Sequence, residues 1–112
     1  RLHPTAAAPQ AYIKAMFADT SGVYIAASDY MKTLARSIAP WMPASYQVLG
    51  TDGYGLSESR EELRDYFEMS AEHICHTALV QLMRTQTKGK RRIQSQIDAL
   101  GINPDKPDPA LR

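Results

Sequence analysis

The first half of the chain alternates between apolar residues at helical spacing and short continuous apolar runs. Four large side chains at spacings of one, three and four predict a helix over residues 10–18 with one apolar face. Residues 23–27 form a continuous apolar run, the pattern of a strand buried on both faces, and residues 46–49 form a second, mostly apolar strand. The side chains of the helical face are Tyr12, Ile13, Met16 and Phe17.

A longer helix is expected between the two strands. Tyr30, Leu34, Ile38 and Trp41 recur at intervals of four, four and three, so residues 30–41 should form an amphipathic helix that covers one face of the sheet. A connection of this length between strands favours a parallel pair with a right-handed crossover. The expected fold class is α/β. The expected start of this helix is a cap at Ser28 or Asp29, and its expected end is set by Pro40 and Pro43.

Two parallel strands do not make a stable sheet in water, because their faces and edges stay open. Further strands are therefore expected from outside this sequence. The first residue is Arg1 and not methionine, which agrees with that expectation. Both observations predict a fragment from the end of a larger chain.

Three glycines in residues 50–57 mark a sharp corner after the second strand. Gly50, Gly53 and Gly55 give the backbone freedom to turn, and we expect positive φ at Gly53 or Gly55. Glycines before a helix can also cradle a phosphate, but the spacing G-x-x-G-x-G differs from that of known phosphate loops. We expect instead a turn that needs glycine because a helix or a partner subunit packs close against it.

The second half of the chain predicts three helices and an extended tail. The expected caps are Ser57 for the first helix and Ser70 for the second, which covers residues 71–84, and Gly101 should end the third. Residues 103–112 contain three prolines and should be extended. The apolar positions of the three helices are Leu63, Tyr66 and Phe67, then Ile74, Cys75, Ala78, Leu79, Leu82 and Met83, then Ile93, Ile97 and Leu100.

Composition excludes several classes of protein. A net charge of +1 gives no broad field for nucleic acid or anionic lipid, and the basic run at residues 88–92 is interpreted as a solvated turn. No apolar run approaches the ~20 residues that span a bilayer, and no signal peptide is visible. The single cysteine cannot form an internal disulfide. These features predict a soluble, cytoplasmic protein without nucleic-acid or membrane partners.

His73, Cys75 and His76 suggest a metal site at first sight, because imidazole and thiolate both bind zinc. On a helix the two histidines share a face, but Cys75 does not, and no second ligand cluster follows. The better interpretation is a helix pair between Glu72 and His76. Cys75 lies on the expected apolar face, where a thiol is usually inert, so no nucleophile is predicted.

The corner also carries a family resemblance. Residues 50–69, GTDGYGLSESREELRDYFEM, resemble the C-terminal domain of the homodimeric bacterial type of pyruvate dehydrogenase, and more distantly the end of transketolases. Tyr54 and Leu56 depart from the usual phenylalanine and arginine of that family. The resemblance extends to residues 1–5, 12–13, 28–32 and 109–111. The matching positions in the corner and helix are Gly50, Thr51, Asp52, Gly53, Gly55, Ser57, Arg60, Leu63, Phe67 and Glu68.

The resemblance implies an enzyme when the full-length chain is considered. This family decarboxylates pyruvate on thiamine diphosphate held with magnesium, and then reductively acetylates the lipoyl group of the acyltransferase component. The family's cofactor and catalytic residues lie in preceding domains. No catalytic, cofactor-binding or metal-binding residue is therefore assigned here, and His3, His73 and His76 receive no such role. The implied partners are a second copy of the chain, in a homodimer, and the acyltransferase.

With this resemblance, the chain divides into three parts. Residues 1–21 are expected to be a connector with a short helix, residues 22–101 a transketolase-like C-terminal domain, and residues 102–112 an extended tail. The leading hypothesis is a non-catalytic domain that supports dimerisation. The alternatives are the C-terminal domain of a transketolase-type enzyme, or a stand-alone module that binds an anion or a protein at the corner.

Overall fold

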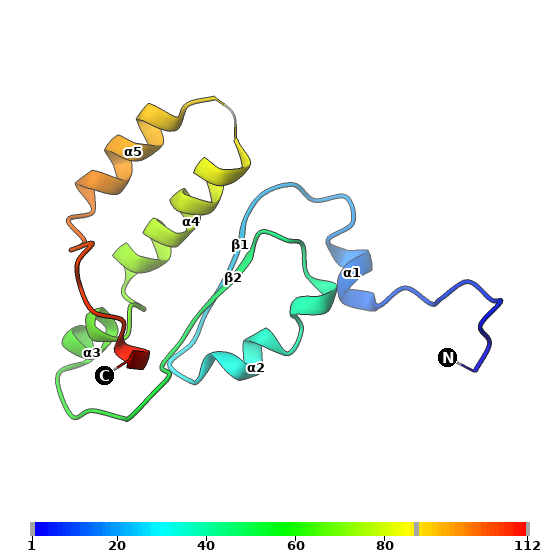
Figure 1. Cartoon of the computed structure of the whole chain (residues 1–112), viewed down its shortest axis with the longest axis horizontal. Coiled ribbons are helices and arrows are strands. Elements are labelled where there is room, and N and C mark those ends of the chain that lie inside the picture. The colour runs from blue at the N-terminus through cyan, green and yellow to red at the C-terminus, as the bar shows by residue number, and fades with distance from the viewer. Residues whose placement is uncertain (1, 87, 112) are drawn as a thin grey trace.

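Two parallel strands lie at the centre of the chain, as the crossover predicted. The computed structural model describes residues 2–86 and 88–111 and pairs β1 (Tyr24–Ala27) with β2 (Tyr46–Leu49), with Tyr24 opposite Tyr46 and Ala27 opposite Leu49 (Figure 1). Helices before, between and after the strands confirm the α/β class. The strands are half-buried and not buried on both faces, because the sheet in the described residues has only these two strands.

The helix between the strands is shorter than predicted. The single helix expected over residues 30–41 was wrong: the structure has α2 (Lys32–Arg36) followed by the 3-10 helix η1 (Ala39–Trp41). Pro40 explains the break, since it has no N–H to donate to the carbonyl of Arg36 four residues earlier and its ring would crowd that carbonyl. α2 packs against β2, and the Tyr46 hydroxyl donates to the carbonyl of Ala35 at 2.8 Å.

The corner after β2 is built on the start of α2. The predicted caps at Ser28 and Asp29 were wrong, because Met31 is the N-cap and makes no side-chain cap bond. Instead Asp52 accepts a hydrogen bond from the Lys32 backbone N–H at 3.0 Å, 20 residues away in the sequence. The corner therefore supplies the capping oxygen of the helix that packs beside it.

Glycine is required at this corner for two different reasons. A Cβ added to Gly50 would lie 2.5 Å from the carbonyl oxygen of Tyr30, so the two backbones meet only because Gly50 has no side chain. Gly53 has φ of 101°, which confirms the expected positive φ, whereas Gly55 is not among the residues with positive φ. Close packing of a helix start against the corner is thus confirmed.

The next helix, α3 (Arg60–Tyr66), begins two residues later than predicted. Its N-cap is Ser59 and not Ser57. The Ser59 hydroxyl oxygen accepts from the Glu62 N–H at 3.2 Å and donates to the Glu62 carboxylate at 2.9 Å, which is a capping box. The sequence carries this signal as Ser59-x-x-Glu62, and Ser57 has no acidic residue three positions later.

Two longer helices form an antiparallel hairpin. α4 (Ala71–Thr85) begins at the predicted cap Ser70 and packs against β1 and against α5 (Lys90–Ala99), as Figure 1 shows. Ile93 is buried, and Gly101 ends this part with φ of 67°. The basic run at 88–92 was interpreted as a turn, but α5 already begins at Lys90.

The two ends of the chain differ from each other. At the N-terminal end, α1 (Tyr12–Met16) is shorter than expected, and Phe17 after it stacks edge-on against Tyr24 of β1. The tail was expected to be extended, but it ends in the 3-10 helix η2 (Pro109–Leu111), beside α3 in Figure 1. The expected part of the tail at residue 112 lies outside the described residues.

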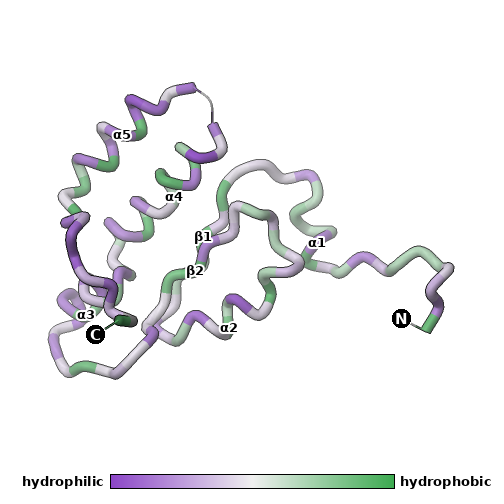
Figure 2. The backbone as a smooth tube through the Cα atoms, viewed as in Figure 1, coloured by the Kyte–Doolittle hydropathy of each residue, from purple (hydrophilic) through white to green (hydrophobic). Residues whose placement is uncertain are grey.

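Few apolar side chains are fully buried. Among the described residues the buried apolar side chains are Phe67, Met69 and Ile93, and hydrophobic residues are spread along the whole trace (Figure 2). The radius of gyration of 17.3 Å exceeds the ~13 Å typical of a compact domain of this length. None of the described helices has both the length and the hydropathy that a membrane crossing requires.

Candidate functional site around His73

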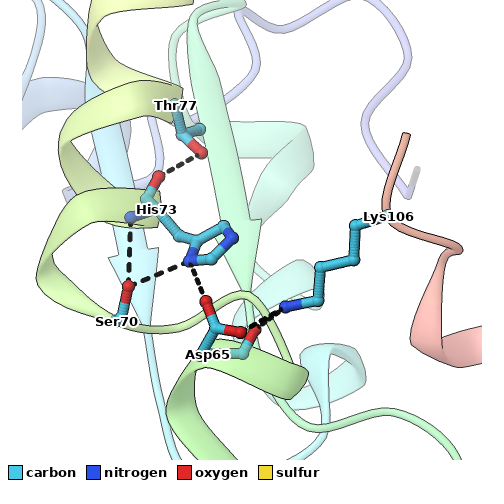
Figure 3. A network of polar contacts seen from close by, with 5 residues as sticks. All are labelled: Asp65, Ser70, His73, Thr77 and Lys106. Atoms are coloured by element: carbon cyan, nitrogen blue, oxygen red, sulfur yellow. Dashed lines mark hydrogen bonds and ion pairs between the residues drawn. The ribbon is translucent and has the colours of Figure 1, made fainter. Parts of the chain in front are cut away.

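The first turn of α4 holds a buried histidine. His73 is 6% exposed, and its Nδ1 lies 2.9 Å from the hydroxyl oxygen of the cap residue Ser70 (Figure 3). The backbone carbonyl of His73 accepts from the Thr77 hydroxyl at 2.8 Å. The cap and the helix interior therefore fix the position of the ring.

The tail reaches the same place through an ion pair. Lys106 Nζ lies 2.9 Å from one carboxylate oxygen of Asp65 and also donates to the backbone carbonyl of Asp65 (Figure 3). The other carboxylate oxygen of Asp65 lies 3.9 Å from Nδ1 of His73. Asp65 and Lys106 are 41 residues apart in the sequence. This contact ties the tail to α3 and α4.

Ser70 holds both the backbone and the ring of His73. Its hydroxyl oxygen accepts from the His73 backbone N–H at 3.4 Å and lies 2.9 Å from Nδ1 of the ring, where the donor is set by the tautomer of the histidine. A hydrogen bond with the Ser70 side chain is also the largest cause of the lowered pKa of Glu72.

This second nitrogen of His73 is buried without a protein partner. In the described part of the chain no hydrogen bond reaches Nε2. Leaving a buried polar nitrogen unpaired costs about 1–3 kcal/mol. Burial also lowers the pKa of His73 below its ordinary value, with Lys106 adding to this effect and Asp65 and Glu68 opposing it. Burial of the ring therefore favours its neutral form.

Nε2 lies on the edge of the ring away from Ser70 and Asp65 (Figure 3). His73 is also one of the residues that line a cavity of about 730 Å³, although Nε2 itself is closed off from water. The walls come from the end of α3, from α4, from α5 and from the tail. Glu68 and Asp98 bring negative charge to this cavity, and Asp98 is held by the Gln94 amide at 2.7 Å. The one ammonium group in its wall, Lys106, is already paired with Asp65.

The metal interpretation gains no support from this geometry. Within residues 2–86 and 88–111, no group of three or more His, Cys, Asp or Glu side chains could hold a metal ion. His73 and His76 do line one cavity, but Cys75 is exposed and does not lie on a buried face as expected. The predicted pair of Glu72 and His76 is also not among the ion pairs of the described residues, and the lowered pKa of Glu72 has a hydrogen bond with Ser70 as its largest cause.

A second cavity, of about 340 Å³, lies at the corner. Asp29 and Thr51, which follow the two strands, line it together with Glu58, Arg60 and Arg64. Arg64 is 3.8 Å from Asp29, so two acidic and two basic side chains balance in this wall. The corner therefore does not present the net positive charge that a phosphate would require.

Sequence reasoning considered His73 only as a metal ligand and did not consider Asp65 or Lys106. The spacing Ser70-x-x-His73 carries the local part of the signal, because an N-cap oxygen faces the third helical residue. The pairing of Lys106 with Asp65 has no local signal. It depends on how the tail folds back over α3.

Comparison with known proteins places the chain in a family. Residues 5–70 match the family model described as transketolase-like TK C-terminal domain. The chain is 42% identical over 111 residues to the pyruvate dehydrogenase E1 component of Buchnera aphidicola subsp. Schizaphis graminum. It is 38% identical over 111 residues to that of Escherichia coli K12, and 37% identical over 110 residues to that of Pseudomonas aeruginosa.

These alignments cover 97–98% of this chain and 12% of each relative. The chain thus spans about an eighth of the length of the curated relatives that it matches. The family model covers the strands, the corner and α3, which are the elements that the resemblance in the sequence predicted. The chain belongs to the family of transketolase-like C-terminal domains.

Proposed function

We propose that this chain is the C-terminal domain of a pyruvate dehydrogenase E1 component and that it supports the association of two copies. In this proposal the full-length protein is cytoplasmic, decarboxylates pyruvate on thiamine diphosphate with magnesium, and reductively acetylates the lipoyl group of an acyltransferase partner. The relatives that align with nearly the whole chain support the assignment.

The described residues do not fit the cofactor. They provide no group of side chains that could hold magnesium, and the wall of the corner cavity carries balanced charge. We therefore derive no step of the thiamine chemistry from this chain. In the proposal the reaction takes place in the remainder of the full-length protein, and this domain contributes through contacts.

Exposed apolar surface is the observation that carries the proposal. Leu34 is 69% exposed and Tyr12 is 78% exposed, and Trp41 and Met16 are about half exposed. Large apolar side chains left in water mark surfaces that pack against another protein surface, and obligate interfaces are the most apolar ones. These four exposed side chains of α1, α2 and η1 are together named here the aromatic face.

Deletion of residues 23–112 from the full-length protein tests the proposal. We expect the deletion to abolish dimerisation and, as a consequence, pyruvate decarboxylation, because large apolar contacts are lost. The measurements are sedimentation velocity and a decarboxylation assay. A truncated protein that remains dimeric and active would contradict the proposal.

A point substitution locates the effect on the aromatic face. Leu34→Asp places a charge on the aromatic face and should shift the protein towards monomer by a factor of about ten or more in the dissociation constant. Thr33→Asp is the matched control, since it adds the same charge to the preceding residue of α2 and removes no large apolar side chain. Equal behaviour of the two variants would show that the aromatic face is not the interface.

A further inference from the structure

The free end of the hairpin carries a cluster of positive charge that the proposed function does not use. Five of the chain's 13 basic residues lie within residues 84–92, where α4 ends and α5 begins. All five are exposed, and no acidic residue lies between Glu72 and Asp98 in the sequence. In Figure 1 this end of the hairpin points away from α3 and the tail. The cluster, named here the basic tip, consists of Arg84, Lys88, Lys90, Arg91 and Arg92.

The basic tip has no acidic partner close by in the described part of the chain. None of the ion pairs among the described residues includes one of its five side chains. Glu72 lies at the other end of α4, roughly 18 Å from Arg84 along the helix axis, and Asp98 lies roughly 9 Å from Arg92 along α5. Both separations exceed the Debye length of about 8 Å at physiological salt. The positive charge is therefore not neutralised within the hairpin.

The stability of α5 does not account for these charges. Lys90, Arg91 and Arg92 lie in its first turn, which contains no acidic residue, and the N-cap Gly89 makes no side-chain cap bond. Cations in this turn are repelled by the positive end of the helix dipole. Carboxylates brought by another molecule offset this repulsion and form paired hydrogen bonds with guanidinium groups, of which the basic tip has three.

The surroundings of the basic tip discriminate among anionic macromolecules. Single-stranded nucleic acid is bound by basic surfaces with aromatic side chains on which bases stack, and residues 68–112 contain no Phe, Tyr or Trp. A net charge of +1 gives the chain no broad field for duplex DNA. Membrane surfaces are bound by basic residues together with exposed apolar ones, and no large hydrophobic side chain of α4 or α5 is among the exposed ones of the described residues. Carboxylates of a protein require neither feature.

We propose that the basic tip is a docking surface for an acidic segment of another protein, in which several Asp or Glu residues follow one another. The carboxylates of that segment pair with the three arginines and two lysines of the basic tip and lie against the first turn of α5. The contact is electrostatic, so it weakens as salt is added. It does not involve the aromatic face and does not depend on dimerisation.

Fluorescence anisotropy of labelled decaglutamate with the full-length protein at pH 7.5 tests the docking surface. We expect saturable binding in about 50 mM salt and its loss in about 0.5 M salt, because added salt shortens the Debye length. A glycine-serine peptide of the same length should not bind. Oligothymidylate of the same length and phosphatidylserine vesicles should bind more weakly than decaglutamate, because the basic tip offers bases no aromatic side chain and lipids no apolar one.

Arg91→Gln combined with Arg92→Gln assigns the binding to the basic tip. The affinity for decaglutamate should fall about tenfold, the combined effect of losing exposed charge pairs. Both substitutions remove a cation from the first turn of α5, so the melting temperature should not decrease and unfolding would not explain the loss. Arg36→Gln combined with Arg60→Gln is the matched control, since it removes two exposed arginines from α2 and α3. The control should leave the affinity unchanged.

Four results would overturn the proposal. These are the absence of saturable binding of decaglutamate, an equal loss of affinity in the control pair, binding of oligothymidylate or of vesicles as tight as that of decaglutamate, and a full-length structure in which another segment of the same chain covers the basic tip. None of these results depends on whether deletion of residues 23–112 abolishes dimerisation. The two proposals can therefore fail separately.

Discussion

The corner after β2 and the hairpin of α4 and α5 are held together in different ways. At the corner, Gly50, Thr51 and Asp52 contact the backbone of residues 29–32, so a few consecutive residues determine how close two segments approach. In the hairpin, the contacts at His73 join side chains from α3, α4 and the tail. Close backbone contacts between two segments thus define the corner, whereas the site at His73 requires the tail to fold back.

This difference predicts that the corner tolerates substitution less well than the hairpin. In the corner, a single added carbon meets a backbone atom, which cannot move without moving α2. At His73, the contacts involve exposed or half-exposed partners such as Asp65, whose side chain is 67% exposed. Exposed ion pairs contribute about 1 kcal/mol or less.

Gly50→Ala should give the largest effect. The new Cβ would lie 2.5 Å from the Tyr30 carbonyl oxygen and 3.2 Å from the Lys32 nitrogen, so β2 or α2 has to shift. We expect a loss of about 3 kcal/mol in the opening free energy of this region, as for severe overpacking. Hydrogen exchange of the β1 and β2 amides in the full-length protein measures it.

Gly55→Ala is the control for this substitution. Gly55 has no atom within 4 Å of an added Cβ and does not have positive φ, so alanine should be neutral or slightly stabilising. A loss of protection as large as that of Gly50→Ala would show that the glycines act through flexibility of the corner. The close approach to Tyr30 would then not be the cause.

Asp52→Ala should have an intermediate effect. It removes the oxygen that accepts from the Lys32 N–H, so we expect a loss of about 1 kcal/mol from the start of α2. Asp52→Asn keeps an accepting oxygen and removes only the 4.0 Å charge contact with Lys32, so it should retain most of the stability. Protection of the α2 amides distinguishes the two variants, and equal losses would assign the effect to charge.

The parts of the fold that sequence predicted are those with local causes. The apolar runs and the length of the crossover were sufficient for the parallel pair of β1 and β2, and Ser70 was recognisable as the cap of α4. The density of glycine predicted positive φ, which Gly53 has. The signal for each of these features lies in a few neighbouring residues or, for the parallel pair, in two local apolar runs and the length of chain between them.

The incorrect predictions involve contacts that are distant in the sequence or choices between similar signals. α2 is capped by Asp52 from 20 residues away, so local reasoning placed its cap at Ser28 or Asp29. Ser57 and Ser59 are equally good caps by residue type, and only the bond with Glu62 separates them. The His73 cluster could not be predicted, since Lys106 approaches Asp65 only in the folded chain.

The pH dependence of stability should give the smallest effect, because opposing charges act on His73. Its pKa is lowered by burial and by Lys106, while Asp65 and Glu68 raise it and His76 lowers it slightly. In the unfolded chain, His73 therefore takes up a proton as the pH falls through about 6.5, whereas in the folded chain it takes up the proton only at a lower pH. Stability should fall as pH decreases through 6.5 towards the folded pKa.

His73→Asn removes this titration and keeps a side-chain N–H that can donate to Ser70. The melting temperature of the full-length variant should therefore decrease less than that of the parent between pH 7.5 and 5.5. Glu62 and Glu72, whose pKa values are lowered from 4.5 by hydrogen bonds with Ser59 and Ser70, lose their contribution only below this window. Parallel melting curves of variant and parent across the window would show that His73 is not held neutral by burial in the folded protein.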